Sequence, residues 1–442
     1  MFAQISARSI RITVLLWFLL ILSACNPIQN NTLSRPIETN DKQETNVSLR
    51  FIGTPNGIGY ELDAKIIEQF TAETGIQVEF VAGPESATDR IALYSDLLNQ
   101  QSTEFDVYQI DVIWPGILGK HFITLSPHLQ EEAHQHFPAI IENNTVNGRF
   151  IAMPFFTDVG LLYYRSDLLE KYGYAHPPQT WDELEEMADT IQTGERAKGN
   201  LEFWGFVWQG AAYEGLTCDA LEWQVSHDGG TIIEADGTIS VNNPNTIAAL
   251  ERAANWIDYI SPPEITGFQE EDARSIWHVG NAAFMRNWPY AYATSQAEDS
   301  FIYNKFDVTA LPSNGTVHAG TLGGWQLAVS QYTNHQEEAI ALVRYLSSKE
   351  VQKQRAIEGS YLPTIPSLYD DTAVLRQNPF FGELKDIFLG GAVARPSNIT
   401  GAHYNEISIA YFTAVHQVLT QQIDAESALL NLEKELTQIV TP

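Results

Sequence analysis

The chain is poor in the residues that form cross-links and metal sites. Its 442 residues include only two cysteines, and the one close histidine pair, His134 and His136, has no third ligand at suitable spacing. These shortages exclude a disulfide framework and argue against a structural metal, so we expect no cofactor. Cys218 lies in an apolar stretch, and we expect it to be a buried, unreactive thiol.

Basic residues are also scarce. The chain has 25 Lys and Arg against 55 Asp and Glu, which gives a net charge of −30, and its isoelectric point is near 4.6. Nucleic-acid backbones and anionic membrane surfaces would repel such a chain, so we expect neither as a partner. With 44% hydrophobic residues the chain can build sizeable cores, and its length predicts two domains.

The chain has a single long apolar run, at its N-terminus. Arg8 and Arg11 precede the apolar residues 12–24, which end in small side chains as a secretory signal does. The cysteine that follows, in the sequence LSAC, resembles the lipobox of bacterial lipoproteins. We therefore predict a signal peptide over 1–24, a lipid on Cys25 and a flexible tether over 25–46. The lipid alone would hold the protein on the periplasmic face of the cell membrane. The alternative is an ordinary secretory signal with an unmodified cysteine.

From residue 47 onward the pattern is that of an α/β fold. Apolar runs typical of strands alternate with amphipathic stretches typical of helices, which predicts a lobe built on parallel strands. The predicted strands are 47–53, 76–82 and 105–111, and the helices between them are 61–74 and 86–100. Ligands in such sheets bind beyond the carboxyl ends of the strands, where Asp111 and Trp114 lie. Asp111 is therefore either a polyol-binding residue or the N-cap of a helix.

Residues 153–169 combine an apolar, aromatic strand with a single carboxylate inside it, Asp158. A helix is expected to begin at Ser166. A carboxylate buried within a strand costs free energy unless a partner hydrogen-bonds it. Asp158 is therefore either a core residue paired with backbone or an arginine, or a cleft residue whose partner is a polar ligand.

The second half of the chain is rich in helical patterns and in tryptophan. Asn334 is predicted to cap a helix, and the residues around Trp325 are predicted to form a loop that leads into a strand. The other predicted elements are helices over 166–172, 181–193, 245–260 and 275–284, a strand over 306–312, and a C-terminal helix that includes 429–439.

No catalytic motif stands out. Residues 53–59 are rich in glycine but lack the Lys-Ser/Thr pair of a phosphate loop, and no serine lies in a nucleophile elbow. A glycosidase would need two carboxylates about 5 to 9.5 Å apart, which a count of acids leaves open. Acids and arginines interleaved with tryptophans suit the binding of a sugar better than its cleavage. Indole faces cover the apolar side of a pyranose while charged groups hydrogen-bond its hydroxyls.

Four segments carry a resemblance to a known family. They are LLYYRSDLLEKYGY at 161–174, FWGFVWQG with YEGL and CD at 203–219, RNWPYA at 286–291 and TLGGW at 321–325. Through them, the chain from Val47 to its C-terminus resembles the solute-binding subunits of bacterial ABC importers, near the trehalose/maltose-binding branch. The resemblance implies two α/β lobes like those of maltose-binding protein, joined by a three-segment hinge and closing on a sugar. It also implies a monomer that delivers its ligand to permease subunits and is not an enzyme. Lobe 1 would comprise 47–157 and 311–346, and lobe 2 would comprise 158–310 and 347–442.

The resemblance further implies sugar contacts from both lobes. By position these are Arg90, Asp111, Phe156, Asp158, Trp288, Gly324, Trp325 and Arg395. Two positions depart from the family pattern, because Gly57 stands where an acid is usual and Phe156 where tyrosine is usual. A lost charged hydrogen bond is worth about 1.5–3 kcal/mol, which is enough to change the preferred sugar. Similar importers of cyanobacteria take up glucosylglycerol, sucrose and trehalose. We expect a ligand with one glucose ring and a smaller second part, which favours glucosylglycerol.

Overall fold

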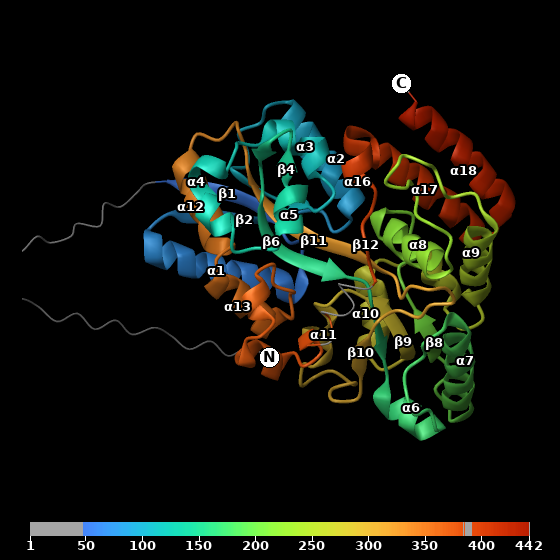
Figure 1. The fold of residues 1–442 in the computed structure, drawn as a ribbon. Helices are drawn as coiled ribbons and strands as arrows, with labels where there is room; N and C mark the ends of the chain where they lie inside the picture. The colour runs from blue at the N-terminus through green and yellow to red at the C-terminus, as the bar shows by residue number, and fades with distance from the viewer. Residues whose placement is uncertain (1–46, 383, 385–390, 442) are drawn as a thin grey trace, which may run out of the picture. The chain divides into compact units, whose positions relative to one another are not determined.

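The computed structural model describes residues 47–382, 384 and 391–441. The predicted signal peptide, Cys25 and the tether lie outside these residues. Within them, the strands form two main sheets, each with its own helices (Figure 1). The α/β class predicted from the sequence is confirmed. No helix in this part of the chain combines the length and apolar character needed to cross a membrane.

The first sheet starts with the strands expected from the sequence. β1 (Ser48–Gly53) pairs in parallel with β2 (Gln77–Ala82) and β3 (Val107–Asp111), and α1 (Gly57–Thr74) and α2 (Ala87–Asn99) connect them. The hydroxyl of Ser86 caps α2 by accepting a hydrogen bond from the backbone N–H of Asp89. α1 ends at Thr74. The left-handed Gly75 that follows donates its N–H to the carbonyl of Thr71 in the last turn. The predicted parallel arrangement of these strands is therefore confirmed.

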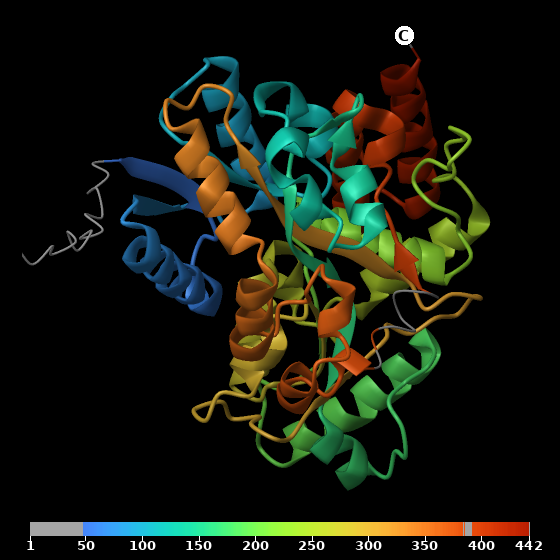
Figure 2. The ribbon, with the colours of Figure 1, turned by 60° about the vertical axis from the view of Figure 1, so that its left-hand side comes forward.

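Two later segments complete this sheet. β11 (Gly320–Val329) pairs antiparallel with β3 and with β6 (Met153–Val159), and in parallel with the short β12 (Ala392–Val393). In Figure 2 the long orange β11 reaches across the molecule toward β12. Along β11, Leu327 joins the core on one face of the sheet and Ala328 the core on the other, as strand alternation requires.

The second sheet has the strand order β10-β7-β9-β8. Its strands are β7 (Leu161–Tyr164), β8 (Trp204–Val207), β9 (Ala282–Asn287) and β10 (Asp307–Thr309). α7 (Trp181–Ala197) packs on β8, and α10 (Glu270–His278) packs on β9. α8 (Glu214–Ser226) and α9 (Pro244–Trp256) lie beside α17 (Tyr404–Leu419) and α18 (Ala425–Val440), although the two pairs are far apart in sequence (Figure 1).

Shorter elements fill the remaining surface. α12 (Gln336–Leu346) packs against β11, and α13 (Lys349–Gly359) packs against α1. These elements are α3 (Pro115–Leu118), α4 (Ser126–Ala133), α5 (Pro138–Asn143), β4 (Thr145–Val146), β5 (Arg149–Phe150), α6 (Ser166–Tyr172), α11 (Ala291–Ser295), α12 (Gln336–Leu346), α13 (Lys349–Gly359), α14 (Thr372–Gln377) and α16 (Ser397–Thr400).

Three sequence predictions are wrong, and a fourth gives a strand that is too long. The helix expected over 275–284 ends at His278, and the apolar residues that follow form β9 between β7 and β8, where sheet packing overrides local helical spacing. The loop expected around Trp325 is part of the continuous strand β11. Asn334 does not cap α12, whose N-cap is His335 without a side-chain hydrogen bond. The strand expected over 306–312 is shorter, Asp307–Thr309.

Two connections between the sheets lie backbone against backbone. The first passes at Gly160, between β6 and β7, and the second enters β11 at Gly320. The N–H of Gly160 donates to the carbonyl of Thr321 at 3.2 Å. A Cβ on Gly320 would lie only 2.8 Å from the carbonyl oxygen of Gly160. Glycine is therefore required where these connections touch. The residue boundaries of the two lobes remain a prediction.

Replacing Gly160 by alanine should destabilise the fold. Its Cβ would lie 1.9 Å from Glu222 Oε1 and 2.7 Å from Arg286 Nη2, two atoms of a buried ion pair. Overpacking of this kind costs about 1–3 kcal/mol, measured as the free energy of unfolding in denaturant. Gly267→Ala is the matched control, because its Cβ meets no atom within 4 Å. Equal stabilities of the two variants would contradict the close packing at Gly160.

Candidate functional site

All eight residues predicted to contact a sugar line one cavity. They are Arg90, Asp111, Phe156, Asp158, Trp288, Gly324, Trp325 and Arg395. They come from α2, the carboxyl ends of β3, β6 and β9, the strand β11 and the segment after β12. Gly57, at the start of α1, lines the same cavity. Residues more than 300 positions apart in the sequence are thus brought together.

Asp158 is the most exceptional of them. It lies in β6, a strand whose residues are all buried, and no described residue donates a hydrogen bond to its Oδ1. Burial raises the pKa of Asp158 well above its ordinary value; the nearby Asp111 carboxylate raises it further, while Arg286 acts in the opposite direction. The alternative of a core aspartate hydrogen-bonded by backbone or an arginine does not describe this oxygen. An unpartnered buried oxygen on the cavity wall is available to a ligand.

Arg395 joins two carboxylates at the cavity. Its Nη1 lies 2.8 Å from Glu214 Oε1 and its Nη2 lies 3.2 Å from Asp111 Oδ1. Asp111 Oδ1 also accepts a hydrogen bond from the N–H of Ile113, whereas α3 has Trp114 and not Asp111 as its N-cap. The alternative of Asp111 as a helix cap is therefore wrong. Arg395 Nε, which is buried, has no hydrogen-bond partner among the described residues.

An aromatic wall adjoins these charges, because Trp325 pairs with Asp111 across β11 and β3. The guanidinium carbon of Arg90 lies 4.4 Å from the ring centroid of Trp325, and Trp114 meets that ring edge-on at 5.5 Å. Arg90 is buried and donates from Nε and Nη2 to the carbonyl of Pro84, at 2.9 and 2.7 Å. Burial lowers the pKa of Arg90. The arginine thus fixes the indole on one side of the cavity.

Gly324 makes this wall possible. It pairs with Thr157 across β11 and β6, and it has a positive φ of 121°. A Cβ there would lie 2.6 Å from the carbonyl oxygen of Phe156. Only glycine can therefore bring the backbone of β11 this close to β6 at the cavity.

The two positions that depart from the family pattern also lie on the cavity. A Cβ on Gly57 would meet nothing within 4 Å, so the missing side chain leaves open space at the start of α1. Phe156 packs against Tyr361 with ring centroids 4.7 Å apart. Phenylalanine at this position offers the cavity no hydroxyl group.

Sequence reasoning missed three glutamates that line the cavity, two of them at the start of α10. Glu270 Oε2 accepts the hydroxyl of Tyr213 at 2.6 Å, and Glu271 Oε1 accepts that of Tyr290 at 2.7 Å. Both glutamates line the cavity, as does Glu85, whose pKa is raised by burial and by the charge of Glu271. Acids in the first turn of α10 are ordinary helix-start residues, so the pattern carried no signal of a site.

Glu214 is a second missed residue. Its carboxylate accepts hydrogen bonds from Arg395 Nη1, the Tyr404 hydroxyl and the Ser408 hydroxyl. Burial raises its pKa in spite of these partners. It lies in the YEGL segment, and the resemblance of that segment to the family was the only sequence feature that pointed to this position. Among the residues the structure describes, no group of three or more His, Cys, Asp or Glu side chains could hold a metal ion.

Comparison with known proteins identifies the family. The model of the bacterial extracellular solute-binding proteins matches residues 53–353. The chain belongs to this family. A probable ABC transporter-binding protein of Deinococcus radiodurans is 49% identical over 395 residues, which cover 89% of this chain and 94% of the relative.

Solved structures place this solute-binding protein among two-lobed folds similar to maltose-binding proteins. The maltose-bound MalE3 of T. maritima superposes with a TM-score of 0.85 at 38% identity, covering 89% of this chain and 100% of that one. An ABC transporter solute-binding protein of Agrobacterium radiobacter K84 in complex with ribitol has a TM-score of 0.78 at 20% identity, over 89% of this chain and 99% of that one. The two-lobed fold expected from the sequence is confirmed. Proteins of this family bind solutes and are not in general enzymes.

Replacing Asp158 by asparagine should stabilise the ligand-free protein at neutral pH. The folded state holds the Asp158 proton more tightly than the unfolded state, because its pKa is raised from the ordinary 3.8. Below that value both states are protonated and the variant gains nothing. As the pH rises above it, the unfolded state loses the proton first, so the wild type is increasingly penalised and the variant's advantage grows. Thermal unfolding midpoints over a pH series measure this difference.

The matched control should show the opposite change in stability at neutral pH. Asp371 caps α14, and its hydrogen bond with Lys353 lowers its pKa. Asp371→Asn should therefore lose stability at neutral pH and lose none in acid. A pH-independent effect of Asp158→Asn would contradict a raised pKa of the Asp158 carboxyl at the cavity.

Proposed function

We propose that this solute-binding protein captures a small carbohydrate between its lobes and delivers it to the permease subunits of an ABC importer. The observation that carries the proposal is the Oδ1 of Asp158, which no described residue hydrogen-bonds, on a cavity lined by Trp288 and Trp325. A sugar hydroxyl would donate to the carboxylate, and the indoles would cover the apolar face of a pyranose. Some of the charged groups on the cavity already pair with one another. Such a lining suits a neutral ligand rich in hydroxyls.

Ligand-driven closure follows from the division of these groups between the lobes. Asp111 and Trp325 belong to the first sheet, whereas Trp288 follows β9 of the second. Neither group buries a sugar alone, so the ligand favours the closed arrangement by contacts that exist only there. The permease would then select the closed form. We propose that a lipid on Cys25 anchors this monomeric protein at the periplasmic face of the membrane.

Glucosylglycerol is our proposed ligand, ahead of trehalose and sucrose. Gly57 leaves space where family members carry an acid, and Phe156 offers no hydroxyl. A ligand with one glucose ring and a three-carbon second part loses least when these groups are missing. A second candidate is a trehalose/maltose-specific protein, which the 38% identity to maltose-bound MalE3 favours.

Titration calorimetry with glucosylglycerol, trehalose, sucrose and maltose tests the ligand. Glucosylglycerol should bind most tightly, because the disaccharides would place a second ring against the Gly57 end of the cavity without its usual partner. Weaker binding of glucosylglycerol than of all three disaccharides would overturn the choice of ligand. The same mixtures are then assayed for released glucose, since hydrolysis would indicate a glycosidase.

Restoring a hydroxyl should shift the preference toward disaccharides. Phe156→Tyr adds a hydrogen-bonding group to the cavity, and such a bond is worth about 0.5–1.5 kcal/mol, or a two- to tenfold gain in affinity. We expect trehalose or maltose to gain by this factor over glucosylglycerol in calorimetry. Phe80→Tyr, on β2 and away from the cavity, is the control and should leave all affinities unchanged. An equal gain for every sugar would argue against a missing second-ring contact.

A further inference from the structure

A buried arginine lies directly behind the cavity wall. Arg286 in β9 is almost wholly buried and does not line the cavity. Its Nε and Nη2 donate to the two oxygens of Glu222, Oε2 at 2.9 Å and Oε1 at 2.5 Å, and its Nε also lies 2.8 Å from Asp219 Oδ1 as an ion pair. Its Nη1 donates to Gln209 Oε1 at 3.1 Å. With partners on each of its nitrogens, the guanidinium has one orientation.

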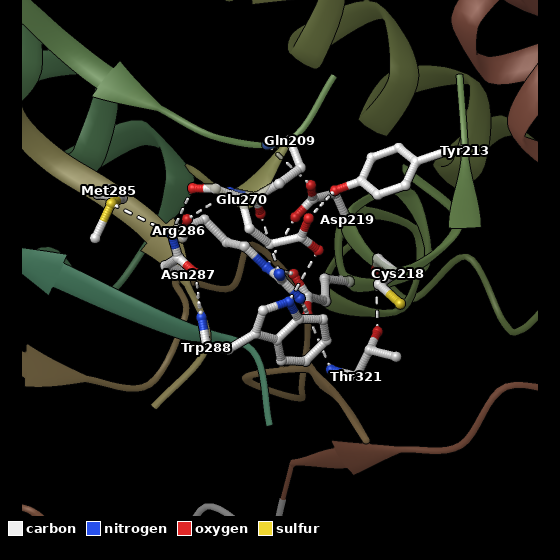
Figure 3. Close-up of polar contacts among 11 residues, drawn as sticks. Gln209, Tyr213, Cys218, Asp219, Glu270, Met285, Arg286, Asn287, Trp288 and Thr321 are labelled. Atoms are coloured by element: carbon white, nitrogen blue, oxygen red, sulfur yellow. Dashed lines mark hydrogen bonds and ion pairs between the residues drawn. The ribbon is translucent and has the colours of Figure 1, made fainter. Parts of the chain in front are cut away.

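The guanidinium lies on the face of Trp288. Its carbon is 4.0 Å from the centroid of the indole, and Figure 3 shows it between the indole and the Asp219 carboxylate. A cation covering one face of the ring leaves the opposite face for the cavity, which Trp288 lines. The indole N–H donates to Glu270 Oε1 at 3.2 Å, so the edge of the ring is held as well.

The same cluster is attached to both connections between the sheets. Glu222 Oε1 accepts the backbone N–H of Thr321 at 3.0 Å, in addition to the N–H of Arg286 Nη2. Gly160, on the other connection, passes so close that any Cβ would strike Glu222 and Arg286. Arg286 is therefore fixed to the part of the fold on which the lobes meet.

We propose that Arg286 is a positioning residue for the ligand. Held by Asp219 and Glu222, its guanidinium sets the plane of the Trp288 indole so that the free face of the ring meets the sugar. The inference rests on the proposed function, in which Trp288 contacts the carbohydrate. Preorganising an aromatic side chain raises affinity, because ligand binding then does not have to order the ring. Lysine cannot replace this arginine, since a compact ammonium does not reach two carboxylates and stack flat on an indole.

A double-mutant cycle tests whether Arg286 acts through Trp288. Arg286→Lys keeps the charge near both acids and should weaken glucosylglycerol binding about tenfold in calorimetry. In a Trp288→Ala background the same change should have no further effect. Arg165→Lys is the matched control: Arg165 is a buried, ion-paired arginine that follows β7 of the same sheet and does not line the cavity. Additive losses in the cycle, or an equal loss in the control, would overturn the proposal.

A second measurement needs no ligand. In protein labelled with 5-fluorotryptophan, the Trp288 resonance is assigned by its loss in Trp288→Phe. Arg286→Lys should shift or broaden that resonance, whereas Arg165→Lys should leave it unchanged. An unmoved resonance in Arg286→Lys would overturn the positioning role. If the wild type bound none of the four sugars, the proposed function would fail, while this spectrum would still decide the role of Arg286.

Folding of the variant is checked by its thermal unfolding. Should Arg286→Lys not fold, Arg286→Met combined with Asp219→Asn and Glu222→Gln removes the ion cluster without leaving a buried charge unpaired. This variant also lacks the cation on the indole, so it should show the same loss of affinity and the same change in the Trp288 resonance. If this variant kept both the affinity and the Trp288 resonance of the wild type, the proposal would be overturned.

Discussion

The ion cluster of Arg286 with Asp219 and Glu222 occupies the place where the chain passes between its two sheets. Breaking such a buried pair costs several kcal/mol, about 3–5 when one partner is removed, because the other charge stays buried. Glu222 also accepts the N–H of Thr321, so the cluster holds backbone as well as side chains. The glycine at position 160 follows from it, since any side chain there would strike the cluster. The cluster thus constrains both the sequence of the connections and the wall of the cavity.

The cavity also contains buried polar atoms that lack hydrogen-bond partners among the described residues. Asp158 Oδ1 and Arg395 Nε are buried, and neither has a hydrogen-bond partner in the part of the chain that the structure describes. Burial raises the pKa of Glu214 and lowers that of Arg90, so both charged forms are held at a cost. Large apolar cores in both lobes compensate for this cost. Polar atoms held ready in this way are the general signature of a binding surface, where a ligand supplies the missing partners.

The sequence predicted elements wherever one local pattern dominated. The α/β alternation of the first lobe and the start of α6 at Ser166 follow from periodicity and end signals. β9 was mistaken for helix because its apolar run fits both periods, and its position between two strands is decided by residues far away. Asp111 and Asp158 stood out as acids in apolar strands. Arg286 did not, because no local pattern shows that it meets acids more than 60 positions earlier.

The missing side chain at Gly57 affects the size of the ligand that fits more than it affects the polarity of the cavity. The same cavity carries Glu85 and Glu271, so hydroxyl acceptors remain although Gly57 has no side chain. Their mutual repulsion contributes to the raised pKa of Glu85, and hydroxyl donors placed between them would relieve it. A short polyol can turn its hydroxyls toward such acceptors, whereas a rigid second ring needs a partner at a fixed place. Under the proposed function, the departures from the family pattern thus favour a small, adaptable second moiety beside a glucose ring.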